Sequence, residues 1–153
     1  MLRSITGFHL DDENHWVAKL ECFHGQHQRH NPPLISRPWV VTDDGRNARL
    51  GTSLNCLRCD RREMPQGLLP DQAPIEINAD TLLADALQDR LDPVMQWGLL
   101  RVTCGNLNLV DGLDDNQTLT ITAGEELVLI PGLSVRLELE PATELLVDFF
   151  SRE

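Results

Sequence analysis

The amino-acid sequence predicts a mainly β protein, α+β overall, with a small β-hairpin domain followed by an antiparallel β-barrel or sandwich. Three observations predict this organisation. All five histidines and three of the four cysteines lie within the first 60 residues. Residues 60–74 contain three prolines and a glycine and have neither a helical nor a strand period. After them, short apolar segments recur about every 8–12 residues, which is typical of an all-β domain.

The charge distribution supports two parts. Residues 1–66 carry 9 Lys and Arg against 8 Asp and Glu, whereas residues 67–153 carry 4 against 16. We therefore predict a first domain over 1–62, an extended linker over 63–75 and a β domain over 76–153. The acidic second part would repel a phosphate backbone, which argues against nucleic-acid binding by the whole chain.

In the first part, residues 5–8 and 16–22 flank the acidic, turn-prone segment 11–14 and predict a β-hairpin. Alternation along the second strand places Ala18, Leu20 and Cys22 on one face, so Cys22 should emerge on the buried side. A short helix is expected from 44 to 50, ending at Gly51, and residues 56–59 are expected to form a compact loop.

Cysteines and histidines between residues 22 and 59 have the spacing of a zinc site. Cys56 and Cys59 form a zinc knuckle, and Cys22 is the expected third thiolate. The fourth ligand is left between two histidines. A four-residue hairpin loop would place His27 opposite Cys22 and is slightly favoured, whereas a wider loop would select His24.

Two or three thiolates without an evident carboxylate indicate a structural zinc. A redox-active cysteine pair is less favoured, because no βαβ pattern surrounds it. His30 precedes two prolines and is expected to pack or to form a hydrogen bond, and Cys104, in an apolar stretch, to be a core thiol. We expect His9 and His15 at the surface.

The second part should begin with an amphipathic helix over 80–91, with Asp80 as N-cap and Pro93 beyond its end. Six strands should follow, separated by glycine- and proline-containing turns. The expected strands are 97–103, 106–110, 118–122, 126–130, 134–139 and 145–149.

Localisation follows from what the sequence lacks. No apolar run approaches the roughly 18 residues that span a bilayer, and no apolar core of about 7 residues follows Arg3 as in a secretory signal. We therefore expect a cytoplasmic protein whose thiols stay reduced and available to metal.

Residues 3–65 resemble an uncharacterised family of short bacterial proteins. The resemblance lies in Ile5-Thr-Gly-Phe-His, Trp16-Val-Ala-x-Leu-x-Cys22-x-His24-x-Gln-His27-x-Arg29-His30-x-Pro-Pro33, Arg37-Pro-Trp39-Val and Cys56-x-x-Cys59-Asp60-Arg61. The resemblance implies zinc binding by cysteines and histidines, with no assigned activity. Phe23 stands where relatives carry glycine.

Residues 75–153 are similar to the small cupin-like domain associated with tellurite-resistance proteins, through Trp97-Gly-x-Leu-x-Val, Leu-Thr-x-Thr-Ala-Gly124, Ile130-Pro-Gly132 and Val147-Asp-Phe-Phe150. This resemblance implies a cupin-like barrel and a link to metal or oxyanion stress. The family's two barrel histidines correspond here to Arg90 and Val135, and no histidine follows His30, so no imidazole-based centre can form in this domain.

From these observations we expect a zinc-binding, two-domain binding or regulatory protein rather than an enzyme. Its expected partners are one zinc ion, a small ligand or protein on the barrel, and a second copy in a homodimer, with no membrane partner. Two alternatives stay open. One is a zinc enzyme that uses His24, His27 and His30, and the other is nucleic-acid binding through the N-terminal arginines 29, 37, 46 and 49.

Overall fold

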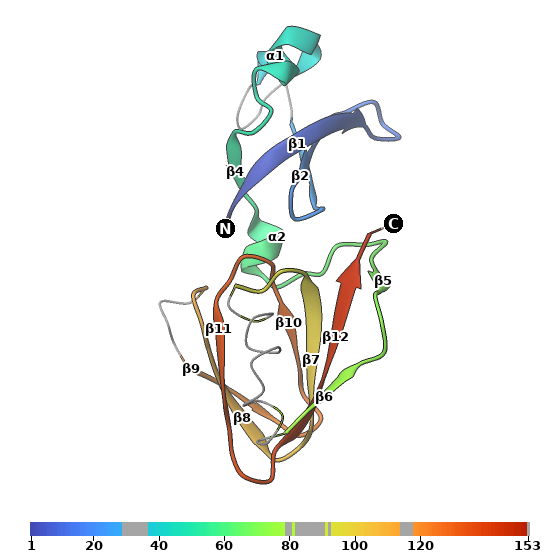
Figure 1. The fold of residues 1–153 in the computed structure, drawn as a ribbon. Coiled ribbons are helices and arrows are strands. Elements are labelled where there is room, and N and C mark those ends of the chain that lie inside the picture. The colour runs from blue at the N-terminus through green and yellow to red at the C-terminus, as the bar shows by residue number, and fades with distance from the viewer. Residues whose placement is uncertain (29–36, 79–80, 82–90, 92, 114–117, 153) are drawn as a thin grey trace. The chain divides into compact units, whose positions relative to one another are not determined.

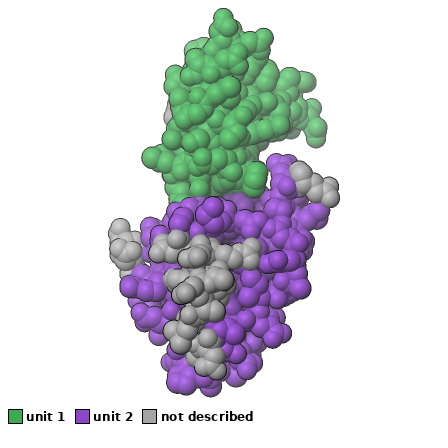
Figure 2. Space-filling view, viewed as in Figure 1, with its two compact units in different colours: residues 1–61 green, residues 62–153 purple. Residues whose placement is uncertain are grey.

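The computed structural model describes residues 1–152 apart from 29–36, 79–80, 82–90, 92 and 114–117. The chain separates into two compact units, Met1–Arg61 and Arg62–Glu153, coloured separately in Figure 2. The predicted helix at 80–91 lies almost entirely outside the described residues. Among the residues that are described, no helix is both long enough and apolar enough to span a membrane.

The first unit contains a four-stranded antiparallel sheet in the order β3-β2-β1-β4 (Figure 1). Its strands are β1 (Leu2–Leu10), β2 (Trp16–Leu20), β3 (Gly25–His27) and β4 (Ser53–Asn55). The β1–β2 pair is the predicted hairpin. The carboxylate of Asp11 closes its turn, because Oδ1 accepts hydrogen bonds from the backbone N–H groups of Glu13 at 2.9 Å and His15 at 2.8 Å.

The described residues of this unit also form three short helical segments: η1 (Pro38–Val41), α1 (Asp43–Asn47) and α2 (Leu57–Asp60). Thr42 caps α1 by accepting a hydrogen bond from the N–H of Gly45 at 3.2 Å. The helix predicted over 44–50 is shorter in the structure, where α1 ends at Asn47. The segment that contains Cys56 and Cys59, expected to be a loop, forms the single helical turn α2.

The described residues of the second unit form two antiparallel sheets (Figure 1). One has the strand order β10-β7-β12-β5, with β6 also paired to β12, and the other has the order β11-β8-β9. The strands are β5 (Leu69–Pro70), β6 (Ile75–Ile77), β7 (Trp97–Cys104), β8 (Asn106–Asp111), β9 (Thr118–Thr122), β10 (Glu126–Leu129), β11 (Val135–Leu139) and β12 (Glu144–Ser151). All six predicted strands are present. Part of the segment expected to be a linker, β5, pairs with the end of β12.

The chain passes from one sheet to the other at Gly105. This glycine has φ +74°, and a Cβ there would lie 2.7 Å from Oγ1 and 2.9 Å from Cα of Thr143. The hydroxyl of buried Thr143 accepts from the N–H of Asn106 and donates to its carbonyl, at 3.2 and 2.6 Å. Only glycine fits this close approach without displacing the neighbouring chain.

Alternate residues of the strands form the core of the second unit, as a period of two requires. The buried apolar residues of the strands are Ile77, Trp97, Leu100, Val102, Leu107, Leu109, Ile121, Leu129, Val135, Leu137, Leu145, Val147 and Phe149. At the end of β8, buried Asp111 pairs with Arg62, whose guanidinium also donates to the carbonyl of Val128 at 3.3 Å. The expected mainly β architecture is confirmed.

Candidate metal centre

The turn between β2 and β3 presents Cys22 and His24. Its backbone is closed by a hydrogen bond from the N–H of Phe23 to the carbonyl of Leu20, at 2.8 Å, and by one from the N–H of Leu20 to the carbonyl of His24, at 3.0 Å. Phe23 sits at the tip with φ +66° and is 44% exposed. Glycine adopts this conformation without strain, which is a physical reason for the glycine that relatives carry where this chain has Phe23.

The second half of the centre comes from the start of α2. Cys56 is the N-cap residue of this helix, and Cys59, three positions later, lies on the same side of the single turn. Backbone hydrogen bonds hold Cys56: its N–H donates to the carbonyl of Met1 at 2.7 Å, and its carbonyl accepts from Asp60 at 3.2 Å. The amino group of Met1 pairs in turn with the Asp60 carboxylate.

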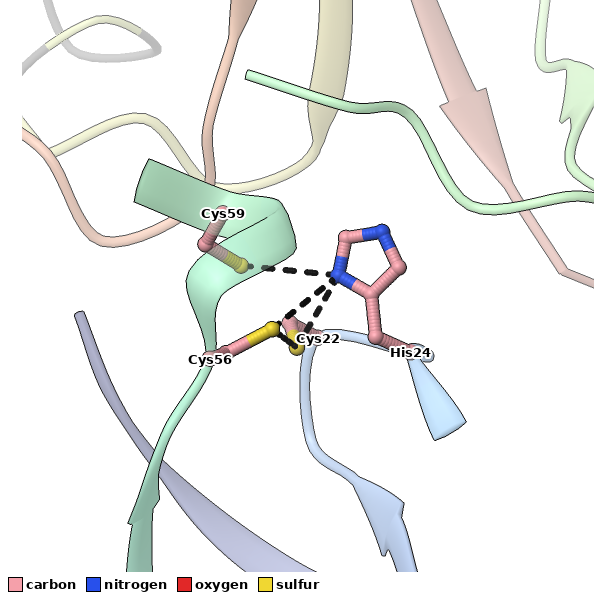
Figure 3. Close-up of side chains that lie close together, drawn as sticks. All are labelled: Cys22, His24, Cys56 and Cys59. Carbon is pink, nitrogen blue, oxygen red and sulfur yellow. Dashed lines mark hydrogen bonds between the residues drawn. The ribbon is translucent and has the colours of Figure 1, made fainter. Parts of the chain in front are cut away.

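Three sulfurs and one imidazole nitrogen converge between the two segments (Figure 3). His24 Nδ1 lies 3.6 Å from Cys22 Sγ, 3.4 Å from Cys56 Sγ and 3.6 Å from Cys59 Sγ. The sulfurs of Cys22 and Cys56 are 3.8 Å apart. All four residues are buried, and His24 is only 1% exposed.

These distances match the ligand spacing of a tetrahedral metal site. Zinc binds thiolate sulfur at about 2.3 Å and imidazole nitrogen at about 2.0–2.1 Å, so tetrahedral ligands lie about 3.5 Å apart for N···S and about 3.8 Å apart for S···S. Hydrogen bonding alone does not account for the arrangement. A single ring nitrogen has one hydrogen to donate or one lone pair to share, yet Nδ1 of His24 is almost equally close to all three sulfurs.

The thiols influence one another because they are close and buried. A hydrogen bond from the Cys59 thiol lowers the pKa of Cys22, and the same interaction, together with burial, raises the pKa of Cys59. Burial is the main cause of the raised pKa of Cys56. The positive charge of Arg3, a residue only 7% exposed, acts in the opposite direction on the pKa of Cys59.

The other histidines predicted from the sequence lie elsewhere or outside the description. The structure places His27 at the exposed end of β3, where its Nε2 is 2.8 Å from the Asp11 carboxylate, and not with the three sulfurs. The geometric reason is the tight turn at Phe23, because it brings Cys22 beside His24, two positions later, rather than beside His27, five positions later. His30, like Arg29, is outside the described residues.

Several expectations about neighbouring residues can be checked directly. His9 and His15 are exposed, as expected. Cys104, expected to be a core thiol, is exposed at the end of β7. Alternation alone would place it on the face of buried Val102, but the pairing of β7 with β12 shifts register between Glu144 and Leu145. Trp16 and Trp39 are half-buried, and guanidinium groups stack on both rings.

Comparison with known proteins finds a family similarity over the segment that contains this centre. Residues 6–63 match a family model described as "Protein of unknown function (DUF3565)". The match spans the four clustered residues, and it confirms the similarity of the first part to a family without an assigned function. No curated protein matches the chain.

The chain is also similar to a crystal structure of an Escherichia coli (strain K12) protein determined as a structural-genomics target. The two are 19% identical with a TM-score of 0.45, and the alignment covers 59% of this chain and 88% of that chain.

Proposed function

We propose that the first unit binds one zinc ion through Sγ of Cys22, Cys56 and Cys59 and Nδ1 of His24. The observation that carries this proposal is the near-equal distance, 3.4–3.6 Å, from one imidazole nitrogen to three buried sulfurs. Zinc suits this donor set because it accepts thiolates and imidazole in a tetrahedron and has no competing geometric preference.

The zinc in this proposal is structural. Four protein ligands fill a tetrahedral shell and leave no position for the water that catalytic zinc sites retain. The ligands come from two stretches more than 30 residues apart, so the ion would cross-link the β2–β3 turn to α2. A unit of about 60 residues buries only about 60% of its unfolded surface, and such small units commonly need an additional constraint.

Arg3 supports the same assignment through its charge. Three thiolates and a neutral imidazole around Zn²⁺ leave a net charge of −1, and a buried charge is costly unless it is balanced. Arg3 is buried and acts electrostatically on Cys59, and its Nη1 also lies 3.8 Å from a carboxylate oxygen of Glu21, whose side chain is 44% exposed. We infer that Arg3 balances the charge of the loaded centre.

In our proposal the protein as a whole is a binding or regulatory module of the cytoplasm, where free thiols persist and can hold a metal. The second unit would act as a cupin-like barrel that binds a partner or small ligand, in the context of metal or oxyanion stress implied by its resemblance. Its two antiparallel sheets with a shared apolar core are compatible with such a barrel.

The enzyme and nucleic-acid alternatives gain no support from side-chain placement. His27 is bonded to Asp11 rather than directed at the cluster. The guanidinium of Arg46 stacks on Trp16 at 3.7 Å and pairs with Asp43, so it already has partners within the unit.

The test is the metal content of the purified full chain, measured by mass spectrometry under native conditions. We expect one zinc per chain in the wild type and in Cys104→Ser, a matched control that removes the exposed thiol outside the cluster. Cys59→Ser should lose the zinc and the first step of a two-step thermal melt while keeping the strand signal of the second unit. A metal-free wild type with a fully folded first unit would refute the proposal.

A further inference from the structure

A small cavity adjoins one side of the proposed zinc centre. It has a volume of about 130 Å³ and is lined by Gly25, Gln26, Cys56, Leu57 and Arg58. Of the four proposed ligands, Cys56 is the one that lines this cavity. One side of an otherwise buried cluster can therefore be approached by a small molecule.

The lining of the cavity is compatible with a small polar molecule. Leu57, 57% exposed, and Arg58, also exposed, border it on the solvent side. Gly25 contributes no side chain, and a Cβ at this position would lie 2.9 Å from Cγ1 of Val17. The side chain of Gln26 also lines the cavity, and its oxygen is buried and accepts no hydrogen bond in the described part of the chain.

We propose that Cys56 is the thiolate at which a hydroperoxide oxidises the centre, and that Cys22 completes the reaction by forming a disulfide with it. The inference rests on the proposed zinc site, because metal coordination keeps both sulfurs as thiolates, the nucleophilic form of cysteine. Cys59 is fully buried and does not line the cavity.

The reaction takes place in two displacements. The Cys56 thiolate attacks one oxygen of hydrogen peroxide, and the S–O bond forms as the O–O bond breaks. Hydroxide is the leaving group, and Cys56 becomes a sulfenic acid. The Cys22 thiolate then attacks the Cys56 sulfur, the S–S bond forms, and the S–O bond breaks to release a second hydroxide. Two thiolates lose one electron each, and one peroxide is reduced to two hydroxides, which the buffer acid of the solution protonates to water.

The distance between the sulfurs of Cys22 and Cys56 permits a disulfide between them. They lie 3.8 Å apart, and a disulfide is about 2.05 Å long, so closure requires a movement of about 1.8 Å. Cys22 also lies outside the strands, beside exposed Phe23 in the β2–β3 turn, so its sulfur can approach Cys56 while the pairing of β2 with β3 is kept. Loss of two of the four ligands would release the metal, so peroxide would remove the cross-link that holds the first unit.

The test uses the zinc-loaded full chain, stoichiometric hydrogen peroxide and a chromophoric zinc indicator, followed by peptide mapping under non-reducing conditions. We expect release of one zinc per chain with a disulfide joining Cys22 to Cys56, reversed by dithiothreitol and added zinc. Leu57→Trp should slow zinc release several-fold by narrowing the cavity, and Leu57→Ala should accelerate it. Leu69→Trp, at a similarly exposed leucine (51%) of the second unit, is the matched control and should leave the rate unchanged.

Zinc content measured before peroxide separates this inference from the proposed function. A chain that carries one zinc but forms no Cys22–Cys56 disulfide, or pairs Cys56 with Cys59 instead, would overturn the inference and leave the zinc site standing. Equal rates of release from the two Leu57 variants and wild type would overturn the role of the cavity. A chain that binds no zinc would overturn both proposals.

Discussion

Replacement of His24 gives the sharpest test of the proposed ligand set, because His27 provides a matched control three residues away. We expect His24→Ala to weaken zinc binding strongly, since it removes the imidazole nitrogen that lies 3.4–3.6 Å from all three sulfurs. We expect His27→Ala to have little effect. Its imidazole is exposed and bonded to Asp11, and exposed pairs of this kind contribute about 0–1 kcal/mol.

The size of the effect follows from sharing the metal's binding free energy among its ligands. Structural zinc contributes about 10–16 kcal/mol of apparent binding free energy, or about 2.5–4 kcal/mol for each of four ligands. Since about 1.4 kcal/mol corresponds to a factor of ten, the affinity of His24→Ala should fall about 10²–10³-fold. In saturating zinc the free energy of unfolding of the first unit should fall by the same 2.5–4 kcal/mol.

Both quantities can be measured on the same preparations. Competition with a chelator of known zinc affinity gives the binding constant, and thermal unfolding followed by circular dichroism in zinc-buffered solution gives the stability. A His24→Ala protein that binds zinc within tenfold of wild type would refute the assignment. So would a loss in His27→Ala equal to that in His24→Ala, because the two positions could not then be distinguished by their geometry.

Three further predictions concern pH and the second unit. The hydrogen bond with the Cys22 thiol and burial raise the pKa of Cys59, so zinc must displace the Cys59 proton, and the zinc affinity should fall about tenfold or more for each pH unit of acidification. Calorimetry in buffers of different ionisation enthalpy measures the proton release. A zinc affinity that does not change with pH would contradict this prediction. Arg62→Met leaves the buried Asp111 carboxylate without its ion-pair partner and should lower the free energy of unfolding by about 3–5 kcal/mol in denaturant melts. The double variant Arg62→Met/Asp111→Leu should recover most of this loss. If it recovers none, the broken ion pair is not the cause of the loss. Gly105→Ala should destabilise the second unit by about 1–3 kcal/mol more than Gly124→Ala, because Gly124 has a similar positive φ but open space around it. Equal losses of stability in the two variants would exclude a steric clash with Thr143 as the cause.

Most of the strand positions could be predicted from the sequence because alternation is a local property. Apolar and polar residues alternate in β8, the longer strands β7 and β12 are rich in apolar residues, and turn residues such as Gly105 and Gly132 separate the segments. The shortest strands, β3 to β6, could not be predicted in this way. Two or three residues show no period, and these strands form only because a longer strand offers unpaired backbone groups beside them.

The sequence alone determined which kinds of atom would meet in the first unit: the spacing of Cys56 and Cys59, with Cys22 at a strand end, was enough to predict three thiolates. Only the tertiary structure decided which histidine joins them. The choice depends on how tightly the chain turns after β2, and that turn is set at Phe23 by backbone hydrogen bonds that no residue pattern displays. The same holds for Arg3, which is one of several arginines in the sequence and reaches Cys59 because the pairing of β1 with β4 brings the two ends of the unit together.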